Sequence, residues 1–175
     1  SKVADSLAIS KEELVTSYQS GKLESKRLDE YFLHDRSLRE SGHDTSSRLV
    51  DVCANLNTVG LNSLLYKYET DFAYLIEEHF DNKIKYQGKT YSSKDWLKLA
   101  DKRKKLMNKL LWDKEQDMFY DYNFVKGKKR RFHSATNYYP LWANLATKKQ
   151  AELLKEELMN SLKAKGGILA STEKS

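Results

Sequence analysis

The scarcity of residues that break helices is what most limits the folds open to this chain. Its 175 residues include one proline, Pro140, and seven glycines. Proline ends or kinks a helix and glycine weakens one, so this composition favours long helices joined by few sharp loops. Between Leu61 and Ile76, apolar residues recur at the helical period over about four turns. Such a helix must bury its apolar stripe against other helices, and we therefore expect an all-α fold.

Capping signals divide the chain into roughly six helices. Starts are predicted at Ser10, Asp29, Ser92 or Ser93, and Thr147. The last of these helices is expected to stop at Gly166-Gly167, and a shorter helix to run over residues 135–146. No repeat or low-complexity linker separates these segments, so the sequence predicts a single domain.

One segment has the period of a strand instead of a helix. Residues 118, 120, 122 and 124 alternate with 119, 121 and 123, which predicts a strand. A turn is expected at Lys126-Gly127-Lys128 and a returning strand over residues 130–134. Basic residues interleaved with aromatics are typical of sites for single-stranded nucleic acid. The run is short and lies on a turn, however, so we predict a solvated hairpin tip and no nucleic-acid partner.

Composition limits the function classes further. The chain has 31 basic and 25 acidic residues and a net charge of +6, and the two signs are interspersed, as on a solvated surface. No apolar run approaches the ~20 residues of a membrane helix, so no membrane association is predicted. The single cysteine, Cys53, permits no internal disulfide and fits a reducing compartment such as the cytoplasm. No cysteine and histidine cluster has metal-ligand spacing, and no metal site is predicted.

The stretch Arg39-Glu40-Ser41-Gly42-His43-Asp44-Thr45-Ser46-Ser47-Arg48 concentrates charged and hydroxyl side chains where a helical pattern meets a turn. One interpretation is a helix end followed by a cap for the next helix. The other is a ligand site, in which the missing Cβ of Gly42 lets a substrate lie against the backbone. Spacing alone leaves both interpretations open.

The same stretch resembles the segment of the family 37 glycoside hydrolases, the trehalases, that carries their catalytic acid. The cytosolic neutral trehalases of fungi are the most similar branch. The resemblance continues in order along nearly the whole chain, over residues 29–36, 61–69, 118–123, 140–148 and 166–168. It implies inverting hydrolysis of trehalose to two glucose molecules. It also implies that residues 1–175 are a fragment of one catalytic domain, part of an (α/α)6 toroid barrel with a small β-hairpin insertion.

The resemblance also implies roles for single residues. Asp44 matches the general acid, and the catalytic base is expected beyond Ser175, so this chain alone is expected to be inactive. Gly42, Arg39, His43 and Arg48 are expected to bind substrate. The wider family more often has tryptophan where this chain has His43, which argues against ring stacking on the sugar there. Arg48 has a structural alternative, a pair with Glu40 or Asp51.

Cofactors and partners follow from the same resemblance. The chemistry needs no cofactor in this chain. Calcium and 14-3-3 proteins are expected only for an amino-terminal regulatory part, with phosphorylation sites, that this sequence does not include. Two other functions remain open: a related (α/α)6 α-glucosidase acting on oligosaccharides, and a non-catalytic trehalase-like interaction or regulatory protein.

Overall fold

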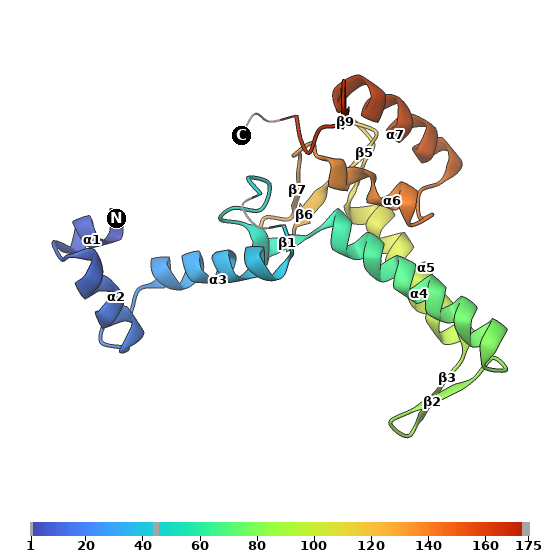
Figure 1. Ribbon diagram of the computed structural model, residues 1–175, viewed down its shortest axis with the longest axis horizontal. Coiled ribbons are helices and arrows are strands. Elements are labelled where there is room, and N and C mark those ends of the chain that lie inside the picture. The colour runs from blue at the N-terminus through green and yellow to red at the C-terminus, as the bar shows by residue number, and fades with distance from the viewer. Residues whose placement is uncertain (1, 44–45, 173–175) are drawn as a thin grey trace. The chain divides into compact units, whose positions relative to one another are not determined.

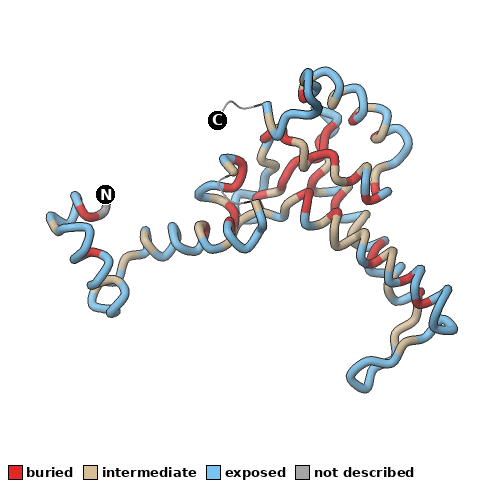
Figure 2. The backbone as a smooth tube through the Cα atoms, in the orientation of Figure 1, coloured by how far each residue is buried: buried red, intermediate tan, exposed pale blue. Residues whose placement is uncertain are grey.

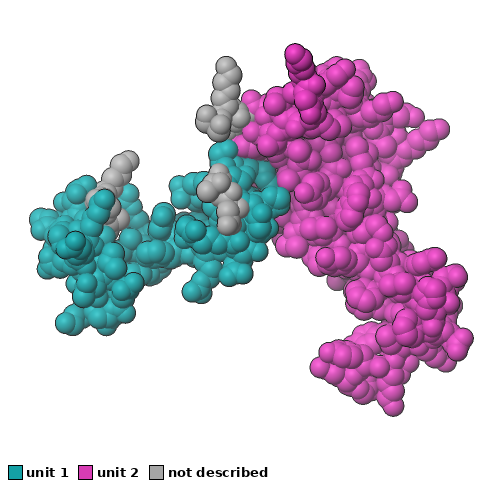
Figure 3. All heavy atoms as spheres, viewed as in Figure 1, with its two compact units in different colours: residues 1–54 teal, residues 55–175 magenta. Residues whose placement is uncertain are grey.

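The computed structural model describes residues 2–43 and 46–172. The chain forms two compact units, residues 1–54 and residues 55–175 (Figure 3). Helices predominate in both (Figure 1), which confirms the prediction of a mostly helical fold.

The first unit contains the helices α1 (Lys2–Leu7), α2 (Lys11–Gln19) and α3 (Lys26–Glu40). The predicted cap of α2 is confirmed, because Ser10 Oγ accepts a hydrogen bond from the Glu13 N–H at 3.0 Å. The predicted cap at Asp29 is wrong. Ser25 caps α3 instead, and the Asp29 carboxylate, inside the first turn, accepts from the Tyr18 hydroxyl at 2.6 Å.

Two long antiparallel helices organise the second unit, α4 (Val59–His79) and α5 (Ser93–Leu110). They pack side by side and are joined by a hairpin of β2 (Ile84–Tyr86) and β3 (Lys89–Tyr91) (Figure 1). The predicted start of α5 is confirmed by a capping box between Ser92 and Asp95. The amino-terminal end of α4 is held from outside the helix, because buried Asp121 accepts from the Val59 N–H at 2.8 Å.

Short strands surround this helix pair. A three-stranded antiparallel sheet has the order β1 (Leu56–Asn57), β6 (Asp121–Asn123), β7 (Lys128–Arg130). The predicted hairpin is β6–β7, but its returning strand is Lys128–Arg130 and not residues 130–134. The expectation of a single hairpin is also wrong. Besides β2–β3, there are pairs of β4 (Trp112–Asp113) with β5 (Met118–Phe119) and of β8 (Lys163–Ala164) with β9 (Gly167–Ile168).

The carboxyl-terminal part is built from short helices around one longer one. The expected helix over residues 135–146 is a 3₁₀ helix, η2 (Ala135–Tyr138), followed by α6 (Tyr139–Trp142). The predicted capping box of Thr147 and Gln150 is confirmed at the start of α7 (Lys148–Ser161). This helix ends at Ser161, before the predicted stop, because residues 163–168 pair as the β8–β9 hairpin.

The core of the second unit lies where α4, α5, the β4–β5 pair and α7 meet (Figure 2). Phe119, Leu145, Leu154 and Leu162 are fully buried there. Away from this core, α4 has a second apolar face toward solvent. Its large side chains are 42–57% exposed: Leu61, Tyr68, Phe72 and Leu75.

Candidate functional site

The charged stretch at residues 39–48 begins in the last turn of α3. Arg39 lies there and donates from Nε and Nη2 to the two carboxylate oxygens of Asp35, at 3.0 and 3.1 Å. The Arg39 side chain is 68% exposed, so this pair is open to water and adds little to stability. Its guanidinium is nevertheless held in a fixed orientation by a two-point contact.

Gly42 turns the chain out of the helix. Its φ of +71° is a left-handed conformation that side chains rarely adopt, and a Cβ placed there would meet no atom of the described residues within 4 Å. The glycine is therefore required by the backbone conformation and not by crowding. Half-buried His43 follows, with its N–H donating to Ser41 Oγ at 3.1 Å and its carbonyl accepting from the Ser46 N–H at 3.1 Å.

Arg48 is buried, with 3% of its surface exposed. A buried guanidinium must be hydrogen-bonded or paired, so this side chain is part of a polar arrangement. Asp44, the predicted acid, lies outside the described residues. The interpretation of this stretch as a cap for the next helix is wrong for the part described, since residues 46–52 form turns and residues 53–55 the short 3₁₀ helix η1 (Cys53–Asn55).

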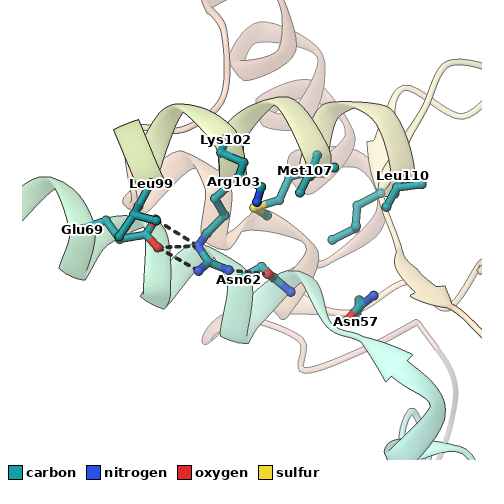
Figure 4. Close-up of a pocket in the computed structure, with 10 residues that line it drawn as sticks. Asn57, Asn62, Glu69, Leu99, Lys102, Arg103, Met107 and Leu110 are labelled. Carbon is teal, nitrogen blue, oxygen red and sulfur yellow. Dashed lines mark hydrogen bonds and ion pairs between the residues drawn. The ribbon is translucent and has the colours of Figure 1, made fainter. Parts of the chain in front are cut away.

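A pocket of about 300 Å³ lies between α4 and α5 of the second unit (Figure 4). Arg103 of α5 reaches across it to α4, where its Nε and Nη2 donate to the Glu69 carboxylate at 2.8–3.1 Å. Its Nη1 donates to Asn62 Oδ1 at 2.9 Å. Leucine side chains form much of the remaining wall: Leu99, Leu106, Leu110 and Leu111.

This network is a cross-link between the two helices. Glu69 has only 8% of its side chain exposed and Arg103 25%, so each charge relies on the other in place of water. The sequence carried a signal for it, since Arg103 occupies a position in the otherwise apolar stripe of α5. None of the residues predicted to bind substrate lines this pocket.

A second polar cluster lies near the carboxyl-terminal part. His133 Nε2 is 2.6 Å from the Tyr138 hydroxyl oxygen, and His133 Nδ1 is 3.8 Å from Glu157 Oε1. Burial lowers the pKa of His133 from its ordinary value of 6.5, against the opposing effect of the Glu157 carboxylate. Burial likewise raises the pKa of Tyr138. The cluster therefore favours a neutral imidazole beside a protonated phenol.

The basic run at the β6–β7 hairpin is not uniformly solvated. Arg131 donates from Nε to Asp113 at 2.8 Å and from Nη2 to Glu115. Burial alone would raise the pKa of Asp113, but the Arg131 guanidinium and the Glu115 N–H outweigh it and lower the pKa. The prediction of a solvated tip thus needs correction at Arg131, whose charge holds the β4–β5 segment.

Two searches concern other classes of site. Within residues 2–43 and 46–172, no three acidic, histidine or cysteine side chains converge in a way that would hold a metal ion. Over the same residues, every helix is too short or too polar to cross a membrane.

Comparisons with known proteins agree with the resemblance. A sequence model of the family described as "Trehalase" matches residues 1–175. A probable trehalase of Eremothecium gossypii is 50% identical over 90% of this chain and 22% of its own length. The cytosolic neutral trehalase of Beauveria bassiana is 44% identical over 94% of this chain and 24% of its own length. The chain thus spans about a quarter of the length of these relatives.

Solved structures give the same result. The neutral trehalase Nth1 from Saccharomyces cerevisiae superposes with a TM-score of 0.92 and 41% identity, over 98% of this chain and 32% of that one. A GH63 mannosylglycerate hydrolase from Thermus thermophilus superposes with a TM-score of 0.52 over 70% of this chain and 27% of that one, and at 18% identity it is similar in fold alone. On the family match over its whole length, the chain belongs to the trehalase family.

Proposed function

We propose that the complete protein is an α,α-trehalase that hydrolyses trehalose to two glucose molecules with inversion. The similarity to the Saccharomyces cerevisiae neutral trehalase, at a TM-score of 0.92 over 98% of this chain, carries the proposal. It is supported by the order of the resembling segments, which runs along the chain from the charged stretch to residues 166–168.

In this proposal Asp44 is the general acid. It protonates the oxygen between the two sugars, while a base outside this chain takes a proton from the attacking water. For Asp44 to hold its proton near neutral pH, its surroundings must raise its pKa above the usual ~3.9. The attacked carbon gains the water oxygen from the opposite face, so one glucose leaves as the β-anomer and the other as the α-anomer.

Four residues of the same stretch are proposed to bind the substrate: Gly42, Arg39, His43 and Arg48. The oriented guanidinium of Arg39 and the buried one of Arg48 are rigid donors suited to sugar hydroxyls. The open space around Gly42 would let a sugar approach the backbone. His43 would donate or accept one hydrogen bond without stacking.

We further propose that both units belong to one (α/α)6 barrel. The outward apolar face of α4 supports this, because large apolar patches of a monomer are normally covered. The barrel would supply the missing helices from the rest of the protein. We also propose a cytoplasmic location, as the names of the cytosolic relatives suggest, with no cofactor. Calcium and 14-3-3 proteins, if they act, would act through the regulatory part.

The test is hydrolysis by the purified complete protein, followed by NMR during the first turnovers. Trehalose should give α- and β-glucose in equal initial amounts, and maltose and longer α-glucosides should react far more slowly. Preference for the longer glucosides would identify an α-glucosidase. The absence of any turnover in a folded protein would identify a non-catalytic member of the family.

A further inference from the structure

Positive charge is concentrated in one segment of the second unit. Residues 83–109 hold ten lysines and arginines and two aspartates, a net charge of +8, whereas the whole chain has +6. The remaining residues therefore sum to −2. The even mixing of signs expected from composition thus fails here, and the excess lies on the β2–β3 hairpin and α5.

Five of these lysines form one stripe along α5. At ~100° and ~1.5 Å per residue, they fall within an arc of about 80° and extend over about 22 Å. All five are exposed: Lys94, Lys98, Lys102, Lys105 and Lys109. The opposite side of α5 carries Ala100, Arg103 and Met107, which face α4 or the core, so the stripe points away from the helix pair.

The stripe differs from the other charges of the helix pair in having no internal ion pair. Arg103 is neutralised by Glu69, and Lys67 of α4 by Asp71. No hydrogen bond or ion pair joins the five stripe lysines to any described residue, although Lys98 is near enough to contribute to the lowered pKa of Asp95. Like charges three and four residues apart repel one another within a helix. The fold gains nothing from this arrangement.

Apolar side chains accompany the stripe. Leu97 and Leu106, each 45% exposed, line a shallow groove together with four of the lysines. Trp96, the aromatic residue of α5, is turned away and stacks on Phe72 of α4 with ring centroids 4.8 Å apart. The groove therefore offers positive charge and aliphatic surface without an aromatic platform.

We propose that the lysine stripe of α5 binds an acidic amphipathic segment of a partner protein. Carboxylates at intervals of three and four residues match the stripe, and aliphatic residues beside them match Leu97 and Leu106. Single-stranded nucleic acid is disfavoured because its bases stack on aromatic rings, which this surface lacks. An anionic membrane is disfavoured because an interfacial helix buries a broad apolar face, whereas two leucines flank this stripe. This interaction surface goes beyond the proposed hydrolysis.

The test uses the complete protein and a fluorescent 18-residue helical peptide with glutamates at the stripe spacing and leucines beside them. Anisotropy should show binding that weakens roughly tenfold between 50 and 300 mM salt, since exposed charges are screened. Replacing all five stripe lysines by glutamate should weaken binding by at least about tenfold. The matched control replaces five exposed lysines elsewhere and has the same net charge: Lys11, Lys126, Lys148, Lys149 and Lys163.

Several outcomes would overturn the proposal. Equal loss in the control variant, or equal binding of a peptide with the same composition in scrambled order, would mean attraction by net charge alone. Tighter binding of a DNA duplex or of phosphatidylserine vesicles through the same lysines would assign the surface to that partner. Lysine acetylation of the unmutated protein, read by mass spectrometry, covers the case of a misfolded variant. The peptide should protect the stripe lysines, and lysines that are unreactive without it would refute an accessible surface.

Discussion

Glu69 and Arg103 place opposite charges in the wall of a pocket, where water reaches only 8% of one side chain and 25% of the other. Lys67 and Asp71, one turn away on α4, form a pair that is 32% and 48% exposed. The energetics of the two pairs differ accordingly. Removal of one partner strands a desolvated charge in the first pair and a hydrated charge in the second.

Glu69→Gln in the complete protein should therefore lower the free energy of unfolding toward the lower end of about 3–5 kcal/mol, because Arg103 keeps some contact with water. Asp71→Asn is the control and should cost at most about 0.5 kcal/mol. Denaturant titration gives both values. Equal small losses would mean that the Glu69–Arg103 pair does not cross-link α4 and α5.

His133 should make stability depend on pH. Its folded-state pKa lies below the 6.5 of the unfolded chain, so the unfolded state takes up a proton first as the pH falls. The stabilising contribution is fully present above pH 6.5 and is lost below it. His133→Gln should therefore flatten the fall in melting temperature between pH 7.5 and 5.5, while exposed His79→Gln should not. A parallel fall in all three proteins would contradict this.

Asp44→Asn should abolish most turnover of the complete protein. An amide cannot give the leaving oxygen its proton, and general acid catalysis alone contributes about 10²–10⁴-fold. The matched control is Asp117→Asn, an exposed position with a φ of +47° that asparagine tolerates. Initial rates on trehalose and melting curves check the prediction. Near-native rates in a folded Asp44→Asn protein would exclude this residue as the acid.

At the scale of elements, the β6–β7 hairpin divides its basic residues between two roles. Replacing Lys126, Lys128 and Lys129 by glutamine should leave trehalose turnover within a few-fold, because these side chains lie at or beside a turn. Arg131→Gln should instead destabilise the protein, by leaving the Asp113 carboxylate without its guanidinium partner. Turnover and melting temperature of the two variants test this division. A large loss of turnover in the triple variant would show that the tip takes part in catalysis.

Helix starts were predictable because a cap is a local signal. Ser10, Ser92 and Thr147 bond amides of their own first turn, and each was found from the sequence. The strands were not predictable, since those of two or three residues are too short to show an alternation. Asp29 misled for a related reason. A first-turn acid resembles a cap in sequence, but here it bonds a tyrosine of the preceding helix.

The candidate site was found by family resemblance and not by local pattern. Spacing alone left residues 39–48 open between a helix cap and a ligand site. The left-handed Gly42 and the buried Arg48 are features that only the folded chain reveals. Arg103 shows the opposite case, in which a charged residue within an apolar stripe was visible but its partner on α4, 34 positions earlier, was not.

For the whole molecule, the outward apolar face of α4 predicts how residues 1–175 behave when expressed alone. They should associate or unfold without cooperativity, because Leu61, Tyr68, Phe72 and Leu75 lack cover. They should also release no glucose from trehalose, since the proposed base lies outside them. Light scattering, thermal unfolding and a glucose assay with the Asp44→Asn control test both expectations. A cooperative monomer that releases glucose would contradict them.

The pairing of α4 with α5 also has a consequence for synthesis. The two helices are neighbours in the chain, so their contact has a short loop to close and forms within milliseconds. The ribosome adds only about 5–20 residues per second. Whatever segment later covers the outer face of α4 therefore emerges long after the pair has formed. During that interval a chaperone that recognises aliphatic and aromatic side chains competes directly with aggregation on the polysome.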